Sequence, residues 1–428
     1  MKYITTTGHK LTRKIFAFSK KLCKDLNRSE FKLISNLLLG ILKAQNCKIS
    51  EIARSLNEKI LLKKTIERLC LGLKNFCMVE KVTENFLEIA QKHIKEDSLL
   101  IIDGGDLAKP KGEKFEKLGW VRDGSTDKIV RGYASVGVVA LTEKKLPITV
   151  YEKIYSHEEK DFSSENTETI IALRHLKRAF FDQNTRVFDR GYDCNTIFSE
   201  LIESHVNFII RMKQTRDVYY KGKKINILKL ANCRKGKYVL KFKKRNRKEA
   251  CCKVSILPIE LPAFPGISLN LVVCRGFSEK PLMLITNITD NDKKICVSVT
   301  KAYLMRWRIE EFYRLKKDQF GFEDVRVRSL SAIRNLSMIL NFALGFLAIL
   351  GDSWQENELG QALIFYARKI YKTVANFCLY SLARGIKYCF SRCNISLYSL
   401  FKEHNKFDHS QLSFFSVLDS VHSFQFVS

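Results

Sequence analysis

The sequence contains no C-x-x-C pair, although it has 13 cysteines. Structural zinc sites use closely spaced cysteine pairs, so this absence argues against a zinc-binding fold. The cysteines are scattered instead, and Cys70, Cys274 and Cys378 lie inside apolar runs where a small buried side chain is expected. We therefore predict reduced thiols in a cytoplasmic protein.

The amino-terminal sequence MKYITTTGHK lacks the apolar stretch of a signal peptide, so secretion is not expected. The strongly apolar segment Met338–Leu350 is interrupted by Asn341 and is shorter than the roughly 20 residues that a membrane-spanning helix needs. It predicts a buried helix, and we expect no membrane as a partner.

Positive charge, in contrast, is abundant along the whole chain. The sequence has 74 lysines and arginines against 45 acids, which gives a formal net charge of +29. This excess predicts a polyanionic partner, and DNA is the first candidate. An AT-rich coding bias toward lysine is an alternative source of part of it, although arginine is also plentiful. The length of 428 residues and the hydrophobic share of 46% predict a globular protein of two or three domains.

Residues 1–97 are expected to form a helical DNA-binding region, because apolar residues recur at helical spacing and proline is absent. Within this region, 48–75 predicts two short helices separated by a polar break at Asn57. Such a pair resembles a helix-turn-helix that presents its second helix to DNA. An ordinary basic helical hairpin has the same pattern. The basic residues of the second helix are Lys63, Lys64 and Arg68.

From residue 98 onward, short apolar runs predict strands. The runs SLLIID and TRVFDR finish at or next to the acids Asp103 and Asp189, and VNFIIRMK finishes with Arg211 and Lys213. Because the carboxyl ends of parallel strands meet at one edge of a sheet, we expect Asp103 and Asp189 to lie close together. Capping or turn positions are the alternative for each of them. The neighbouring acids that compete for the same role are Asp106, Asp182 and Asp193.

Two stretches are expected to lie outside the regular strand order. Residues 109–131 are rich in glycine and charge and predict a loop. Residues 215–292 predict a β-rich insertion with a cationic face, in which KKINILKL is one of several strand-like runs. The basic residues in the middle of the insertion are Arg234, Lys235, Lys237, Lys241, Lys243, Lys244, Arg245, Arg247 and Lys248.

The stretch from Thr300 to Phe320 predicts one helix with two distinct faces. At about 100° per residue, four polar side chains share one face, which is expected to be exposed, and an apolar stripe lies opposite and is expected to pack on the core. A surface helix with solvated ion pairs is the alternative interpretation. The polar set is Tyr303, Arg306, Glu310 and Lys317; the apolar set is Leu304, Met305, Ile309, Phe312, Leu315 and Phe320.

The spacing Y-x2-R-x3-E-x6-K, together with the segments RWRIEEF, VFDRGYD and LIIDGGD, closely resembles the DDE transposases of the insertion-sequence-four family. The resemblance covers residues 98–335. It implies an α/β fold, namely a ribonuclease H-like mixed sheet with flanking helices, between helical amino- and carboxy-terminal regions. The catalytic core would then comprise residues 98–214 and 293–350, and the helical region 351–428 is a candidate dimerisation region.

The resemblance also implies the chemistry of the site. Asp103, Asp189 and Glu310 would be the catalytic residues and the ligands of two Mg²⁺ ions, for which Mn²⁺ would substitute, with Asp103 bridging the metals. Glu311 is the adjacent competitor for Glu310. The expected DNA-binding residues are Tyr303, Arg306, Lys317, Arg190, Arg211 and Lys213.

By the same resemblance, the protein would bind the ends of an insertion sequence, cut them by metal-activated hydrolysis and join the 3′-OH ends to target DNA. A homodimer in a synaptic complex on the bacterial nucleoid is the implied assembly. The alternatives are a metal-dependent nuclease and an inactive DNA-binding derivative. Hairpin-forming relatives have a tryptophan on the last strand of the insertion, whereas KPLMLITN has none, so the hairpin step stays open. The alternative is that another ring, such as Phe277, takes its place. The chain's tryptophans are Trp120, Trp307 and Trp354.

Overall fold

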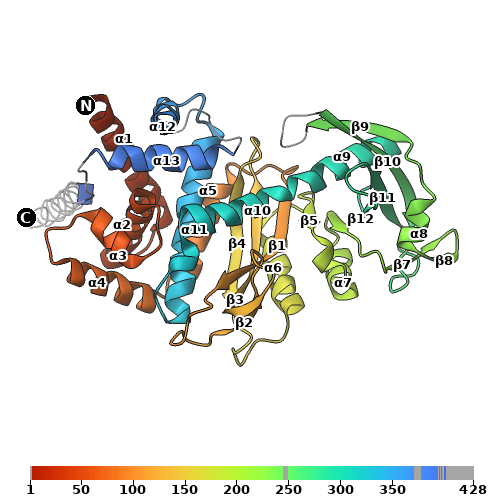
Figure 1. Cartoon of the computed structure of the whole chain (residues 1–428), viewed down its shortest axis with the longest axis horizontal. Coiled ribbons are helices and arrows are strands. Elements are labelled where there is room, and N and C mark those ends of the chain that lie inside the picture. The colour runs from red at the N-terminus through yellow and green to blue at the C-terminus, as the bar shows by residue number, and fades with distance from the viewer. Residues whose placement is uncertain are drawn as a thin grey trace, which may run out of the picture. The chain divides into compact units, whose positions relative to one another are not determined.

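The computed structural model describes residues 2–243, 249–370 and 377–393, together with 395, 397, 400 and 401. The chain forms two compact units, which are described one at a time (Figure 1). The helical unit comprises Met1–Phe86, Asp324–Val327 and Ser331–Ser428, and the sheet unit comprises Leu87–Glu323 and Arg328–Leu330.

Helices make up the described parts of the amino- and carboxy-terminal regions, as predicted. The break predicted at Asn57 is a left-handed C-cap with φ of 50°, and the next helix starts five residues later. The helices are α1 (Lys2–Leu22), α2 (Arg28–Ala44), α3 (Ile49–Leu56), α4 (Leu62–Asn75), α5 (Val79–Gln91), α11 (Leu330–Asp352), α12 (Glu358–Arg368) and α13 (Cys378–Phe390). Parts of 351–428, including 402–428, lie outside the described residues.

Helix α11 is longer than the segment 338–350 predicted for it. Its 23 residues are enough, by length and composition, to cross a membrane, but 89% of its most apolar 18-residue window is buried inside the protein. Phe342 packs against Phe86 with ring centroids 4.8 Å apart, and a Cβ atom at Gly345 would come within 2.5 Å of the same ring. The prediction of a buried helix is confirmed, and the helix extends beyond the apolar run on both sides.

The sheet unit is built on five strands in the order β4-β3-β1-β5-β6. Strand β1 pairs antiparallel with β3 and parallel with β5, and β5 pairs parallel with β6. This is the strand arrangement of a ribonuclease H-like fold, so the predicted fold class is confirmed. The strands are β1 (Leu100–Ala108), β3 (Ile129–Leu141), β4 (Pro147–Tyr155), β5 (Arg186–Phe188) and β6 (Phe208–Arg211).

Helices cover both faces of this sheet. On β4, Lys153 forms an ion pair with Glu168 of α6 (Glu165–Ala179), while its neighbour Glu152 pairs with Lys316. Successive side chains of a strand point to opposite faces, so α6 and the segment carrying Lys316 lie on opposite sides. Helix α7 (Asn195–Glu203) packs beside α6.

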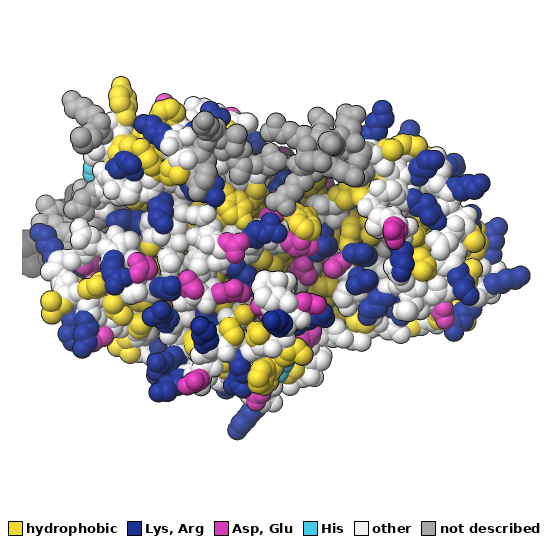
Figure 2. All heavy atoms as spheres, in the orientation of Figure 1, with side chains coloured by type: hydrophobic (Ala, Val, Ile, Leu, Met, Phe, Trp, Pro, Cys, Tyr) yellow, Lys and Arg dark blue, Asp and Glu magenta, His cyan; other side chains and the backbone are white. Residues whose placement is uncertain are grey.

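The insertion continues the core sheet. Its last strand β12 pairs antiparallel with β6, so β12-β11-β10-β9 extends the sheet to ten strands within the described residues. In Figure 2, many lysine and arginine side chains and few acidic ones lie on the visible surface where Figure 1 shows the insertion. The elements are β7 (Asp217–Tyr220), β8 (Lys223–Asn226), α8 (Ile227–Asn232), β9 (Tyr238–Lys243), β10 (Glu249–Ile259), β11 (Leu269–Arg275) and β12 (Leu282–Thr286). Of the predicted basic residues, Lys244, Arg245, Arg247 and Lys248 lie outside the described residues.

Two local predictions were wrong. The expected loop 109–131 contains a strand, β2 (Gly119–Arg122), which pairs with the start of β3. The run KKINILKL is half strand and half helix, because the side chain of Asn226 accepts hydrogen bonds from the backbone N–H groups of Leu228 and Lys229 and starts α8. Asparagine is a strong helix N-cap, and this local hydrogen bonding outweighs the strand preference of the flanking residues.

Candidate active site

The helical stretch predicted from Thr300 to Phe320 is not one continuous helix. Helix α9 (Asp292–Met305) ends before Arg306, helix α10 (Trp307–Arg314) begins after it, and Leu315–Gln319 forms a π-helical turn. Helix α9 packs against β10, β11 and β12, and α10 packs against β1 and β4. Figure 1 shows the two helices running along the sheet from the insertion toward these core strands.

Asp103 and Asp189 come from neighbouring parallel strands. The pairing of β1 with β5 ends at Ile102 opposite Phe188, so Asp103 and Asp189 are the next residue on each strand. The expectation that they lie at one edge of the parallel pair is met. Strand β1, however, does not end at Asp103, because β3 continues to pair with it as far as Ala108.

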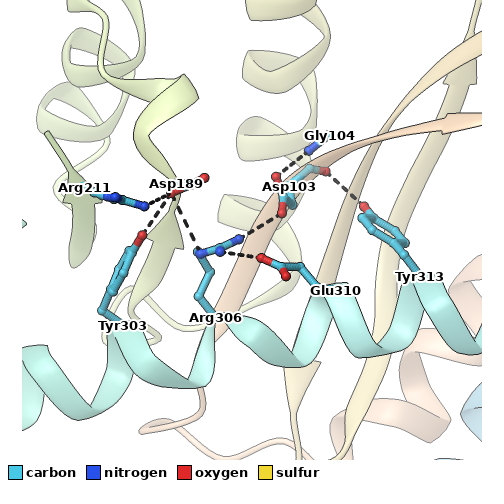
Figure 3. Close-up of polar contacts among 8 residues, drawn as sticks. All are labelled: Asp103, Gly104, Asp189, Arg211, Tyr303, Arg306, Glu310 and Tyr313. Carbon is cyan, nitrogen blue, oxygen red and sulfur yellow. Dashed lines mark hydrogen bonds and ion pairs between the residues drawn. The ribbon is translucent and has the colours of Figure 1, made fainter. Parts of the chain in front are cut away.

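One guanidinium group brings three carboxylates together. Nη1 of Arg306 lies 3.1 Å from a carboxylate oxygen of Asp103, Nη2 lies 2.5 Å from Glu310, and Nε lies 4.0 Å from Asp189 (Figure 3). The Arg306 side chain is only 11% exposed. Three acids spread over more than 200 residues of sequence therefore converge on a single, largely buried cation.

Asp189 has further partners on the same side. The hydroxyl of Tyr303 donates a hydrogen bond of 2.9 Å to it, and Nη1 of Arg211 lies 3.6 Å away. Tyr303 is buried rather than exposed as the helical wheel suggested, because it packs between α9 and the strand end that carries Asp189. The structure thus places Tyr303, Arg306 and Arg211 of the predicted DNA contacts beside the acids.

Lys317 does not join this cluster. Its ammonium group lies 2.8 Å from Asp106 and 2.8 Å from Glu323. The wheel assumed regular α-helical spacing from Glu310 to Lys317, and the π-helical turn breaks that spacing. Burial opposes the charge on Lys317, but the two carboxylates outweigh it and raise its pKa.

The remaining predicted residues have separate environments. Arg190 follows Asp189 directly and is exposed, and Lys213 is exposed and donates a hydrogen bond of 3.2 Å to the backbone carbonyl of Asp193. The competing acids are each paired elsewhere, Asp106 with Lys317, Asp182 with Lys177, Asp193 with Arg216 and Glu311 with Arg308.

Burial and charge separate the two aspartates. Burial is the largest influence on Asp103, and with Asp189 and Glu310 it raises the pKa of Asp103 from 3.8 to about 7, although Arg306 acts against it. Burial also acts to raise the pKa of Asp189. There Arg306, a backbone N–H, Tyr303 and Arg211 outweigh it and lower that pKa. Asp189 therefore stays ionised to a lower pH than Asp103 does.

This difference predicts how stability changes with pH. As the pH rises from about 4 to about 7, the folded protein retains a proton on Asp103 that the unfolded chain has released, so stability falls across this window. Asp103→Asn removes the group whose ionisation causes this loss.

Without metal, the free energy of unfolding of Asp103→Asn should therefore exceed that of wild type at pH 8, by a difference on the order of 4 kcal/mol. At pH 4 the two free energies of unfolding should be nearly equal. Urea unfolding of both proteins at the two pH values measures this, and equal slopes with pH would contradict it.

One residue of the site was not predicted. The hydroxyl of Tyr313 donates a hydrogen bond of 3.0 Å to the backbone carbonyl of Asp103 (Figure 3). Its position three residues after Glu310 puts it near Glu310 on the helix surface, and that spacing was the available signal.

The chemistry of these side chains fits a magnesium or manganese ion. Asp103, Asp189 and Glu310 offer only carboxylate oxygens, which hard divalent cations prefer. Within the part of the chain that the structure describes, no group of three His, Cys, Asp or Glu side chains already has an arrangement that holds a metal. The guanidinium of Arg306 lies among the three carboxylates and balances their charge in this state.

Comparison with known proteins identifies the family. The family described as transposase DDE domain matches residues 95–346, which is more than half of the chain. This chain belongs to the transposase DDE domain family. Its activity is DNA strand cleavage and strand transfer, in DNA transposition. The matched span of this DDE transposase includes Asp103, Asp189 and Glu310.

Other comparisons were made with solved structures and with curated proteins. This DDE transposase is similar to the cryo-EM structure of a piggyBac transposase synaptic complex with hairpin DNA. The similarity covers 90% of the present chain and 78% of the piggyBac chain, with 10% sequence identity and a TM-score of 0.45. No curated protein matches the sequence.

Proposed function

We propose that this DDE transposase binds the ends of an insertion sequence, cleaves the DNA there and joins the freed 3′-OH ends to target DNA. The observation that carries the proposal is the convergence of Asp103, Asp189 and Glu310 on one buried guanidinium. Phosphodiester cleavage needs concentrated negative charge to hold cations beside the scissile phosphate. Three carboxylates from two strands and a helix provide it.

Asp103, Asp189 and Glu310 would hold two divalent cations, Mg²⁺ or Mn²⁺, and such ions generate the attacking hydroxide and stabilise the leaving oxygen. Asp103 is central to this set, since it lies beside both other acids in the electrostatics of the site. The guanidinium of Arg306 must move from among the carboxylates as cations enter. Once released, it is placed to bind a DNA phosphate.

Positive charge around the site supports binding of the DNA backbone. Arg211 lies beside Asp189, and Arg190 is exposed directly after it. We propose that these residues, with Tyr303 and Arg306, hold the phosphates next to the cleavage point, and that Lys213 and Lys317 contribute farther along the DNA. The spacing of Tyr303, Arg306, Glu310 and Lys317 supports placement in the insertion-sequence-four group of this family.

The helical regions are assigned supporting roles. We propose that residues 1–97 contact the DNA ends, with α4 as the basic helix of a helix-turn-helix-like pair, and that 351–428 joins two copies in a synaptic complex on the bacterial nucleoid. Helix α4 has Lys63, Lys64 and Arg68 on a short amphipathic helix, which supports the first assignment.

A strand-transfer assay tests the proposal. Pre-cut end DNA, taken from the sequence that flanks the gene, is incubated with a target plasmid, the protein and Mg²⁺. We expect joined end–plasmid products with wild type and none with Asp189→Asn. Asp182→Asn is the matched control, because Asp182 is an exposed aspartate at the other end of the same strand region, paired with Lys177. Nicked plasmid without joined products would indicate a plain nuclease, and DNA binding without either product would indicate an inactive derivative.

A further inference from the structure

Tyr313 connects the helix that carries Glu310 to the strand that carries Asp103. The side chain projects from α10 toward β1, and its hydroxyl donates a hydrogen bond of 3.0 Å to the backbone carbonyl of Asp103. The contact is thus made to the main chain of Asp103 and does not occupy its carboxylate, which faces Arg306. Glu310 and Tyr313 are three residues apart on one helix, so a shift of one moves the other.

The glycine at position 137 makes room for the tyrosine hydroxyl, and Gly105 lies beside the ring at ordinary contact distance. Gly137 on β3 is directly opposite Asp103 in the strand register. A Cβ atom at Gly137 would collide with the hydroxyl of Tyr313, whereas the next nearest atom, ring Cζ, would be 3.4 Å away. A Cβ atom at Gly105 would be 3.6 Å from the same Cζ. The ring therefore lies directly on the backbone of β1 and β3, at the level of Asp103.

A buried ion pair fixes the same segment three residues later. Nζ of Lys316, in the π-helical turn, lies 2.5 Å from a carboxylate oxygen of Glu152 on β4, and the two side chains are only 4% and 8% exposed. Lys317 follows at once and pairs with Asp106 on β1. The segment after Glu310 is thus held to β1 through Tyr313 and Lys317 and to β4 through Lys316.

We propose that Tyr313 is a positioning residue that sets the separation between the Asp103 and Glu310 carboxylates for metal binding. The proposal rests on the proposed function, because it concerns the metal site of the same reaction. Tyr313 itself touches neither metal nor DNA in this scheme. Its role is to fix the distance between α10 and the backbone of β1 at Asp103.

The tyrosine is suited to that role by its environment. Its ring lies between α10 and the strand backbone at Gly137. A backbone carbonyl oxygen can only accept, so the tyrosine hydroxyl is the donor, and the contact has a fixed direction and length.

A double-mutant cycle tests the inference. The proteins are wild type, Tyr313→Phe, Gly137→Ala and the double variant, and the readouts are Mn²⁺ affinity without DNA, measured by electron paramagnetic resonance, and the rate of end cleavage. Loss of contacts that orient metal ligands costs about tenfold to a hundredfold in affinity. We expect a loss of that size in Gly137→Ala and a smaller one in Tyr313→Phe. The double variant should match Tyr313→Phe, because the atom that collides with the new methyl group is gone.

The matched control is Tyr133→Phe. Tyr133 on β3 is a buried tyrosine whose hydroxyl also donates to a backbone carbonyl, that of Glu116. It lies opposite Leu107, four residues along the strand pair from Asp103 and Gly137. It should lower the unfolding midpoint as Tyr313→Phe does and leave Mn²⁺ affinity unchanged.

The outcomes separate this inference from the proposed function. Equal losses of Mn²⁺ affinity from Gly137→Ala in both backgrounds, or a loss in Tyr133→Phe as large as in Tyr313→Phe, would overturn the positioning role. If wild type binds Mn²⁺ and shows the expected cycle but never joins DNA, the positioning role stands and strand transfer is the part that fails.

Discussion

Glu310→Gln is expected to lower the rate of Mg²⁺-dependent DNA cleavage by about a thousandfold or more, which corresponds to about 4 kcal/mol of lost transition-state stabilisation. The amide keeps the size of the side chain and can still accept a hydrogen bond from Arg306, but it removes one of the three negative charges that would hold cations. The side chain of Glu310 is 31% exposed, so the change should alter stability little compared with activity. Cleavage of labelled end DNA over a Mg²⁺ titration measures the effect.

The adjacent glutamate provides a matched control. Glu311 lies on the same helix, is 17% exposed and pairs with Arg308 rather than with the aspartates. Glu311→Gln should therefore cleave within a few-fold of wild type, a free-energy change of roughly 1 kcal/mol. If the two variants lost activity equally, or if Glu311→Gln alone lost it, the assignment of Glu310 would be wrong.

Arg306→Gln should lower the stability of the metal-free protein more than the other substitutions proposed above. Removing the guanidinium leaves three carboxylates without their shared counter-charge, and breaking a buried ion pair from one side costs about 3–5 kcal/mol. We expect the lower end, about 3 kcal/mol at pH 8, because the side chains of Asp189 and Glu310 are 34% and 31% exposed. At pH 5 the loss should be smaller, since Asp103, whose pKa is about 7, then accepts a proton.

Divalent cations should reverse this loss. Mg²⁺ or Mn²⁺ supplies the missing positive charge, so it should raise the unfolding midpoint of Arg306→Gln more than that of wild type, in which Arg306 competes with the ion. Thermal unfolding with and without each ion measures the difference. Arg308→Gln, which loses an ion pair to Glu311 on the same helix, is the control and should respond to metal as wild type does. A metal response no larger in Arg306→Gln than in wild type would show that the guanidinium does not compete with the ion.

Much of the core could be predicted from the sequence. Apolar runs followed by acids identified the ends of the parallel strand pairing at Asp103 and Asp189, because buried parallel strands are continuous apolar segments with polar residues where that pairing stops. The family resemblance carried by the spacing around Arg306 and Glu310 pointed to Glu310 as the third acid. These signals are local in sequence. The register of β1 with β5 then places Asp103 and Asp189 side by side.

Other features depend on contacts that a periodic pattern does not contain. A wheel with constant rotation placed Lys317 beside Glu310, but the π-helical turn directs Lys316 and Lys317 to acids on two different strands. The continuation of β1 beyond Asp103 depends on its pairing with β3, and the start of α8 depends on the side-chain cap of Asn226. The contact of Tyr313 with Asp103 required the glycine at position 137, whose relevance appears only once the strands are aligned.

The pairing of β12 with β6 has a mechanical consequence. Leu284 of β12 lies opposite Arg211 of β6, the residue whose guanidinium reaches Asp189. Because the insertion shares backbone hydrogen bonds with the core, it cannot swing as a hinged flap without breaking that ladder, at roughly 1 kcal/mol per bond. A load applied to the insertion by bent DNA would instead be transmitted along a continuous sheet to β6, the strand whose Arg211 lies beside Asp189.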